Sequence, residues 1–171
     1  MPRAAQREPR PGASVIGEEY LYFVDRALDG MSGIVEDLGY ELANTRPALA
    51  GANSPYAILT HSLGVVEHWV GARLIGRPDR RDRPAEFRAV GPLGPLLERV
   101  STARTQLADD LVSVRGDVPV ARQPDARFQP PSGPLTETGV LLHVLQELAQ
   151  HHGQMELTRD LLTASGEAGS S

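Results

Sequence analysis

The sequence predicts an all-α fold, a bundle of four helices with long connections between helices two and three and between helices three and four. Apolar residues recur at spacings of three and four in four separate stretches, which is typical of amphipathic helices. Proline and glycine concentrate between these stretches. A chain of 171 residues is the size of one domain and can bury roughly 70% of its unfolded surface, so one core is expected.

The first predicted helix covers residues 18–43 and ends near Asn44, ahead of Pro47. Residues 1–17 hold arginines and prolines but no continuous apolar run, so we expect a disordered tail without the core of a secretory signal. No stretch approaches the ~18 apolar residues that a membrane span needs. The sequence therefore predicts a cytoplasmic location and no membrane partner.

The second predicted helix covers residues 56–75 and follows a clear start signal at 51–55, Gly-Ala-Asn-Ser-Pro. Asn or Ser can cap a helix, and proline fits its first turn. The inward stripe of this helix places His61 among apolar neighbours that include Trp69. A lone histidine on such a face is more often a hydrogen-bonded core residue than a ligand, so both interpretations stay open at this point.

Two proline-rich connections flank the third predicted helix, residues 93–114. Residues 76–92 are expected to be a connection without helix, long enough at ~3.3 Å per residue to let helices two and three run parallel. Its arginine-rich run 77–83 reads as a solvated loop, with an anion or partner site as the less favoured alternative. Residues 116–134 form a long loop that could cover one end of the bundle. Phe128 could anchor this loop, although a plain packing role is the favoured alternative.

The fourth predicted helix covers residues 135–163 and carries three of the five histidines. A small, polar tail follows at 164–171. Residues four apart lie on one face of a helix, so Glu147 and His151 can point their ligand atoms at one spot. With His61 they would supply three ligands to a divalent metal and leave a position open for water or substrate.

Spacing alone does not single out this pair. His143 with Glu147 and His152 with Glu156 are also four apart, and His152 lies on the strongest apolar stripe of the helix. A carboxylate and a histidine at this spacing are common on solvated faces. From periodicity the choice of ligands stays open.

The composition narrows the chemistry. The chain contains no cysteine, which excludes disulfides and thiolate metal ligands, so any reacting thiol must come from a bound small molecule. A net charge of -5 gives no support for a nucleic-acid partner, because such surfaces normally carry a basic patch.

Residues 53–69, from Asn-Ser-Pro to Thr-His-Ser-Leu-Gly-Val-Val-Glu-His-Trp, and residues 147–154, Glu-Leu-Ala-Gln-His-His-Gly-Gln, resemble motifs of the DinB-like superfamily. They are similar in particular to its mycothiol-dependent branch, the metal-binding domain of maleylpyruvate isomerase and the mycothiol S-transferases. The resemblance covers roughly residues 18–163 and implies a DinB-like four-helix bundle.

In that family a histidine of helix two, a His or Glu of helix four and a His four residues later bind a divalent metal, usually zinc. Carried over by position, these are His61, Glu147 and His151. Glutamate at position 147 is the form found in the isomerase branch. Related members often have histidine where Gln154 stands, which argues against a ligand role for that position. The second domain of the isomerase is not expected here.

The resemblance further implies that mycothiol, or a similar small thiol, binds the metal as cosubstrate and attacks an electrophilic small molecule. No catalytic residue is assigned beyond the metal ligands. His152, Glu67 and His68 are candidates for orienting the ligands, and Trp69 for bordering the cavity. Family members are often dimers, so a homodimer is the expected assembly if the chain is not a monomer. The alternative is a non-catalytic, metal- or ligand-binding stress protein of the same fold.

Overall fold

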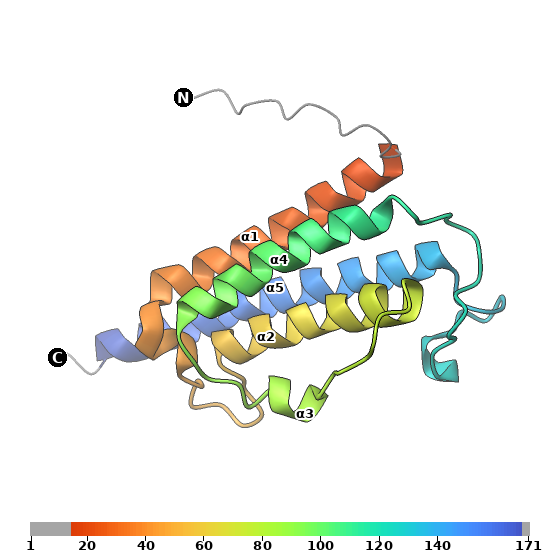
Figure 1. The fold of residues 1–171 in the computed structure, drawn as a ribbon. Helices are drawn as coiled ribbons and strands as arrows, with labels where there is room; N and C mark the ends of the chain where they lie inside the picture. The colour runs from red at the N-terminus through yellow and green to blue at the C-terminus, as the bar shows by residue number, and fades with distance from the viewer. Residues whose placement is uncertain (1–14, 169–171) are drawn as a thin grey trace.

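The computed structural model describes residues 15–168, with side chains from residue 17 to residue 164, and this part of the chain is helical without a β-strand (Figure 1). The expected all-α bundle is therefore confirmed. The elements, in chain order, are α1 (Val15–Asn44), α2 (Pro55–Val66), the π-helix η1 (Glu67–Leu74), α3 (Arg83–Glu86), α4 (Leu93–Leu111), the 3₁₀-helix η2 (Ala126–Phe128) and α5 (Glu137–Ala168).

The long helices form a bundle with one crossover connection. In Figure 1, α2 and α4 run in one direction and α1 and α5 run in the opposite direction. Helices two and three of the predicted bundle are thus parallel, as the length of residues 76–92 indicated. Both α1 and α2 pack against α4 and against α5.

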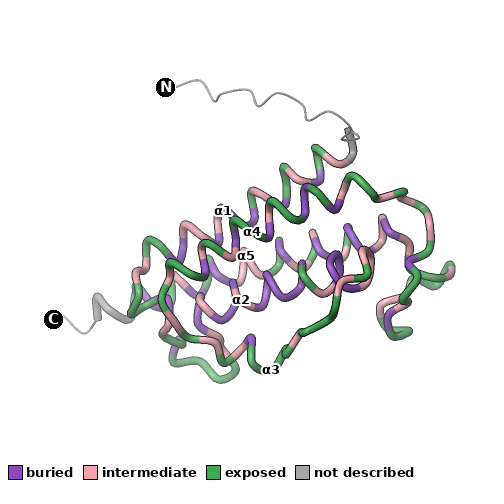
Figure 2. The backbone as a smooth tube through the Cα atoms, viewed as in Figure 1, coloured by how far each residue is buried: buried purple, intermediate pink, exposed green. Residues whose placement is uncertain are grey.

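The core lies between the four long helices, where Figure 2 shows the buried positions of each helix facing inward. Burying a Leu or Met side chain fully contributes about 1.5–3 kcal/mol, so these faces hold the bundle together. The largest fully buried apolar side chains include Leu28 and Met31 of α1, Leu59 and Leu63 of α2, Leu107 of α4, and Leu148 and Met155 of α5.

The ends of the helices differ from the predicted ends by a few residues. The first helix begins at Val15 and the last continues to Ala168, so parts of the expected tails are helical. The third helix stops at Leu111, short of the predicted 114. The rest of the expected tails, residues 1–14 and 169–171, lies outside the described residues.

The second helix changes geometry half-way. It starts as predicted, with the Oγ of Ser54 accepting a hydrogen bond from the backbone N–H of Ala57 at 3.3 Å. From Glu67 onward it is a π-helix, in which Ile75 N–H donates to the carbonyl of Val70, five residues earlier. Such π-turns are rare and occur frequently at functional sites.

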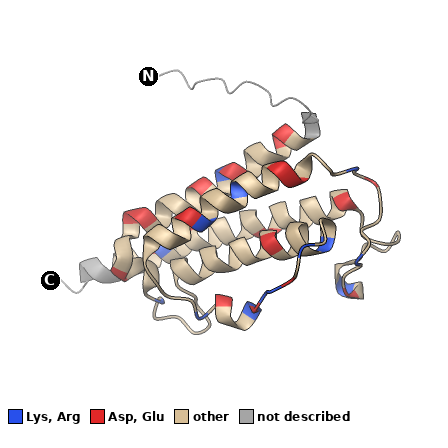
Figure 3. Ribbon diagram, in the orientation of Figure 1, with Lys and Arg blue, Asp and Glu red and all other residues tan. Residues whose placement is uncertain are grey.

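Residues 76–92 are more structured than predicted. The connection contains the single turn α3, whose first N–H groups are capped by Asp82. Two arginines of the expected solvated run are ion-paired. Arg77 forms a bidentate ion pair with the buried Asp110 of α4 at 2.7 and 2.5 Å, and Arg81 forms an ion pair with Glu86. Figure 3 shows both signs of charge along this segment.

The second long connection, between α4 and α5, folds over the end of the bundle where these two helices meet (Figure 1). The side chain of Gln123 organises it. This amide donates to the carbonyls of Val120 and Leu135 at 2.8 and 2.9 Å and accepts from Leu135 N–H at 2.8 Å. Phe128 is half-buried and packs against the core. None of the described helices combines the length and the hydropathy that a membrane-spanning segment requires.

Replacing the cap of α2 tests this fold locally. Ser54→Ala should lower the free energy of unfolding by about 1 kcal/mol, because the Ala57 N–H loses its acceptor in a buried place. Urea unfolding followed by circular dichroism measures the change. The matched control is Ser101→Ala on the exposed side of α4, which should leave stability unchanged or slightly raised.

Candidate metal centre

Three of the side chains singled out in the sequence meet at one place. His61 comes from the middle of α2, while Glu147 and His151 come from successive turns of α5. One ligand atom from each residue lies within 4.8 Å of the other two. His61 is buried, at 1% exposure, and the other two are half-buried. We call these three residues the triad; a set of two imidazoles and one carboxylate is suited to zinc and similar divalent ions.

The imidazole of His61 is held by a residue that the sequence did not indicate. Its Nδ1 lies 2.7 Å from Oε2 of Glu86 in α3, and Arg81 donates to both carboxylate oxygens of Glu86 at 2.8 and 3.1 Å. An ionised carboxylate can only accept, so His61 must donate from Nδ1. Its Nε2 lone pair is thereby left for a metal, as in the carboxylate–histidine–metal arrangement of many zinc sites.

A close backbone approach makes this contact with Glu86 feasible. Gly64 lies one turn after His61 on α2, and a Cβ at this position would fall 2.1 Å from Oε1 of Glu86. Any larger residue would therefore push the Glu86 carboxylate away from the imidazole. The close contact with Glu86 therefore explains why glycine stands at position 64 in the His-Ser-Leu-Gly segment.

His151 is oriented in the same way from its own helix. Its Nδ1 lies 3.0 Å from the amide oxygen of Gln154, which can only accept, so Nδ1 carries the proton. Its Nε2 lies 3.6 Å from Oε2 of Glu147. Gln154, which the resemblance discounted as a ligand, thus acts as the partner that positions one. The His61 and His151 rings meet edge to face, with centroids 4.8 Å apart.

The electrostatics of the site favour the forms that bind metals. Burial lowers the pKa of His61 below its ordinary value, so this imidazole is neutral near pH 7. The neighbouring imidazole of His151 holds the pKa of Glu147 below its ordinary range. Burial raises the pKa of Glu86, but hydrogen bonds from Arg81 and His61 outweigh it and keep this carboxyl ionised.

A cavity of about 410 Å³, which we call the triad cavity, opens beside His61 and Glu147. One wall is aromatic, with the ring centroid of Trp69 lying 4.4 Å from that of His143 and 5.2 Å from that of Phe128. Burial lowers the pKa of His143, so its imidazole is also neutral near pH 7. The basic residues that line the cavity are arginines, namely Arg73, Arg81, Arg83 and Arg127.

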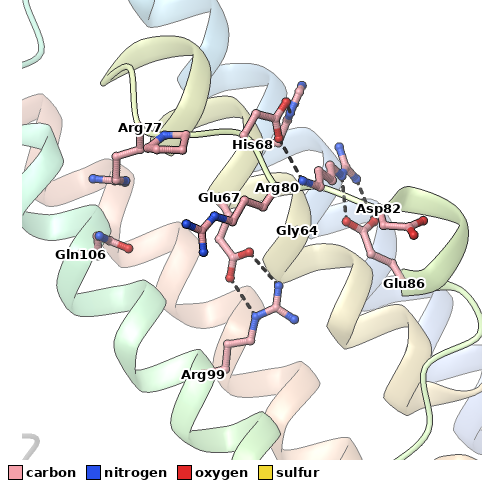
Figure 4. Close-up of a pocket in the computed structure, with 12 residues that line it drawn as sticks. Gly64, Glu67, His68, Arg77, Arg80, Asp82, Glu86, Arg99 and Gln106 are labelled. Atoms are coloured by element: carbon pink, nitrogen blue, oxygen red, sulfur yellow. Dashed lines mark hydrogen bonds and ion pairs between the residues drawn. The ribbon is translucent and has the colours of Figure 1, made fainter.

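The other residues singled out in the sequence lie elsewhere or have other roles. The imidazole of His152 packs on α1, where a Cβ on Gly30 would fall 2.0 Å from its Nε2, so His152 does not orient the triad. Glu67 forms a bidentate ion pair with Arg99 of α4 at 2.8 and 2.7 Å. It lines a second cavity, also of about 410 Å³, on the other side of the 76–92 connection (Figure 4).

His68 and Trp69 do line the triad cavity. His68 lies between the two cavities, with Nδ1 2.9 Å from Asp79 and Nε2 accepting from Arg73 at 2.9 Å. His143, which shares the four-residue spacing with Glu147, belongs to the aromatic wall and not to the triad. The rotation of α5 thus brings Glu147 and His151 to His61 and places His143 and His152 in other surroundings.

One known protein family matches the chain over most of its length. The family model for mycothiol S-transferases matches residues 20–164, which is most of the chain and includes the whole triad. The chain belongs to the mycothiol S-transferase family. The DinB-like, mycothiol-related resemblance of the two motifs is therefore confirmed at the level of the family. No individual curated protein matches this mycothiol S-transferase family member.

The contact between Glu86 and His61 makes a prediction for the metal-free protein. Glu86→Gln removes a negative charge that favours the imidazolium form, so the pKa of His61 should fall further below its ordinary value. Titration of the His61 ring protons by NMR measures this. Glu67→Gln, in the second cavity, is the control and should leave His61 unchanged. A His61 pKa that is the same in both variants would contradict the contact.

Proposed function

We propose that this mycothiol S-transferase family member is a divalent-metal-dependent thiol S-transferase. His61, Glu147 and His151 would hold the metal, most suitably zinc, and mycothiol or a similar small thiol would be the nucleophile. The observation that carries the proposal is the meeting of these three ligand atoms within 4.8 Å at the edge of a cavity. A bound divalent metal would supply Lewis acidity, which lowers the pKa of a coordinated thiol so that the thiolate is present at neutral pH.

The residues around the triad are suited to this chemistry. Glu86 and Gln154 fix the tautomers of the two imidazoles, so little reorganisation is needed when an ion binds. Glu147 is ionised and offsets part of the positive charge of the ion. Because the chain has no cysteine, the reacting thiol must belong to a cosubstrate, as the family name suggests.

The triad cavity offers a place for the electrophile and for the proton of the thiol. Trp69 and Phe128 present apolar ring surface that excludes water from a bound substrate. The neutral imidazole of His143 lies in the same wall and can accept a proton. The product is a thioether when the electrophile loses a leaving group, or an isomerised substrate when the thiol adds and departs again.

Metal content tests the first half of the proposal. Protein purified without an affinity tag should contain about one zinc per chain, in keeping with a site of three protein ligands. Mutating a residue that only hydrogen-bonds to a metal ligand typically weakens metal binding by about 10–100-fold. His151→Gln and Glu147→Gln remove proposed ligands, so each should weaken zinc binding by more than this. His152→Gln is the matched control, because it lies on the same helix and packs on α1, and it should bind zinc as the parent does.

Turnover tests the second half and separates the two candidate classes. The zinc-loaded protein should conjugate mycothiol to a soft electrophile such as monochlorobimane, and His151→Gln should lose at least ~100-fold of kcat/KM. Mass spectrometry of the thioether product measures this directly. Stoichiometric zinc without turnover across several small thiols would instead support a non-catalytic binding protein of the same fold.

A further inference from the structure

Arg73 is the most firmly positioned cation of the triad cavity that has no ion-pair partner. Its Nε donates to His68 at 2.9 Å, and NH1 donates to the carbonyls of Arg122 and Gln123 at 3.4 and 3.3 Å. The guanidinium carbon lies 5.3 Å from the centroid of the Trp69 ring, which supports it from one face. Within residues 17–164, NH2 has no hydrogen-bond acceptor and no carboxylate forms an ion pair with this guanidinium.

The π-helix is the reason why Arg73 takes this position. Residues five apart would lie roughly 140° apart around an α-helix and could not touch across its surface. In a π-helix the hydrogen bonds join residues five apart and the turn is wider, so Arg73 comes within hydrogen-bond distance of His68 and stays near Trp69. The local geometry of η1 therefore directs a guanidinium at the cavity.

The cavity is lined by four arginines and by three carboxylates, those of Asp79, Asp125 and Glu147, so positive charge is in slight excess there although the whole chain has a net charge of -5. Arg83 and Arg127 lie at the cavity against aromatic faces, those of Phe87 and Phe128. Arg127 is 3.9 Å from Asp125, and both side chains are largely exposed, so this pair is weak.

None of the three acidic groups that line the cavity, Asp79, Asp125 and Glu147, forms an ion pair or a hydrogen bond with Arg73. Asp79 faces His68 at 2.9 Å, and Glu147 belongs to the triad. Asp125 pairs weakly with Arg127, and the charge of Arg73 acts on Asp79 without direct contact. The guanidinium NH2 is therefore a donor without an acceptor, beside an aromatic wall and next to the site where the chemistry is expected.

We propose that the electrophile of this enzyme carries an anionic oxygen group of the carboxylate type, and that Arg73 binds it. That the bound acid is the electrophile of the reaction rests on the proposed function. That the cavity binds an anion rests only on Arg73 and its neighbours. A flat, conjugated or aromatic acid fits best, because its ring can lie along Trp69 and Phe128 while its carboxylate meets NH2. Arg73 is thus a specificity-determining residue.

Trp69 is the single tryptophan of the chain and touches Arg73, so its fluorescence reports binding without turnover. Benzoate and benzamide, which have the same shape and differ in charge, should be titrated into the zinc-loaded protein. Benzoate should bind at least ~10-fold more tightly, as expected for a charge-assisted hydrogen bond. Equal binding of the two compounds would overturn the inference.

Variants separate Arg73 from the metal as the binder of the carboxylate. Arg73→Gln should remove the preference for benzoate, and Arg73→Lys should keep part of it, because lysine retains the charge but not the fork. Arg88→Gln, an exposed change away from the cavity, should behave as the parent. A preference for benzoate that survives in Arg73→Gln would assign the carboxylate to the metal and overturn the inference. Should Arg73→Gln unfold, Arg73→Lys and the ligand pair still decide.

A second arm uses turnover so that failure of the two proposals can be told apart. The substrates are 4-chloro-3,5-dinitrobenzoate and its methyl ester, with mycothiol as the nucleophile. In Arg73→Gln, kcat/KM for the acid should fall at least ~10-fold while that for the ester stays unchanged. Conjugation of both substrates without this difference overturns the inference and leaves the transferase intact. Arg73-dependent binding of benzoate without any conjugation supports the anion site and counts against the transferase.

Discussion

The buried hydrogen-bond chain from Arg81 through Glu86 to His61 is the constraint on which the site depends. Glu86 is 8% exposed and His61 is 1% exposed, so each polar group would cost several kcal/mol if it were left without a partner. Arg81 offsets the cost for the carboxylate, and the carboxylate does the same for the imidazole. Removing any one of the three residues leaves a buried polar group of a neighbour without its hydrogen-bond partner. The three residues therefore stabilise the site together and not as separate contacts.

This chain explains why the crossover connection is structured. To supply Glu86, residues 76–92 must return along the outside of α2 and form a turn of helix opposite His61. Gly64 provides the close approach that this turn needs, and the pair of Arg77 with Asp110 fastens the beginning of the connection to α4. The connection thereby divides the surface into two cavities, which share His68, Asp79 and Arg81 as lining residues. Figure 4 shows the cavity that Glu67 lines. What looks like a linker is part of the candidate metal centre.

The sequence predicts those features that repeat locally and misses those made by distant contacts. Apolar periodicity identifies the four long helices, and Asn-Ser-Pro marks the start of α2. Glu86 stands 25 residues from His61 in a charged stretch, and no spacing rule links the two. The apolar residues of α5 leave its rotation open, because His143, His151 and His152 all have a carboxylate four residues away. Packing of α5 on Gly30 of α1 settles that rotation by turning His152 away from the triad.

The π-helical turn is the feature that connects the fold with substrate choice. Nothing in Glu-His-Trp-Val-Gly-Ala-Arg-Leu distinguishes a π-helix from an α-helix by local propensity, so tertiary contacts must select it. The wider turn brings His68, Trp69 and Arg73 together at one side of the triad cavity, and the loop carbonyls of residues 122 and 123 hold the guanidinium there. In an α-helix Arg73 would stay on the face of Trp69, four residues earlier, but would turn away from His68. Backbone hydrogen bonds that span five residues instead of four thus place Arg73 beside His68 at the wall of the triad cavity.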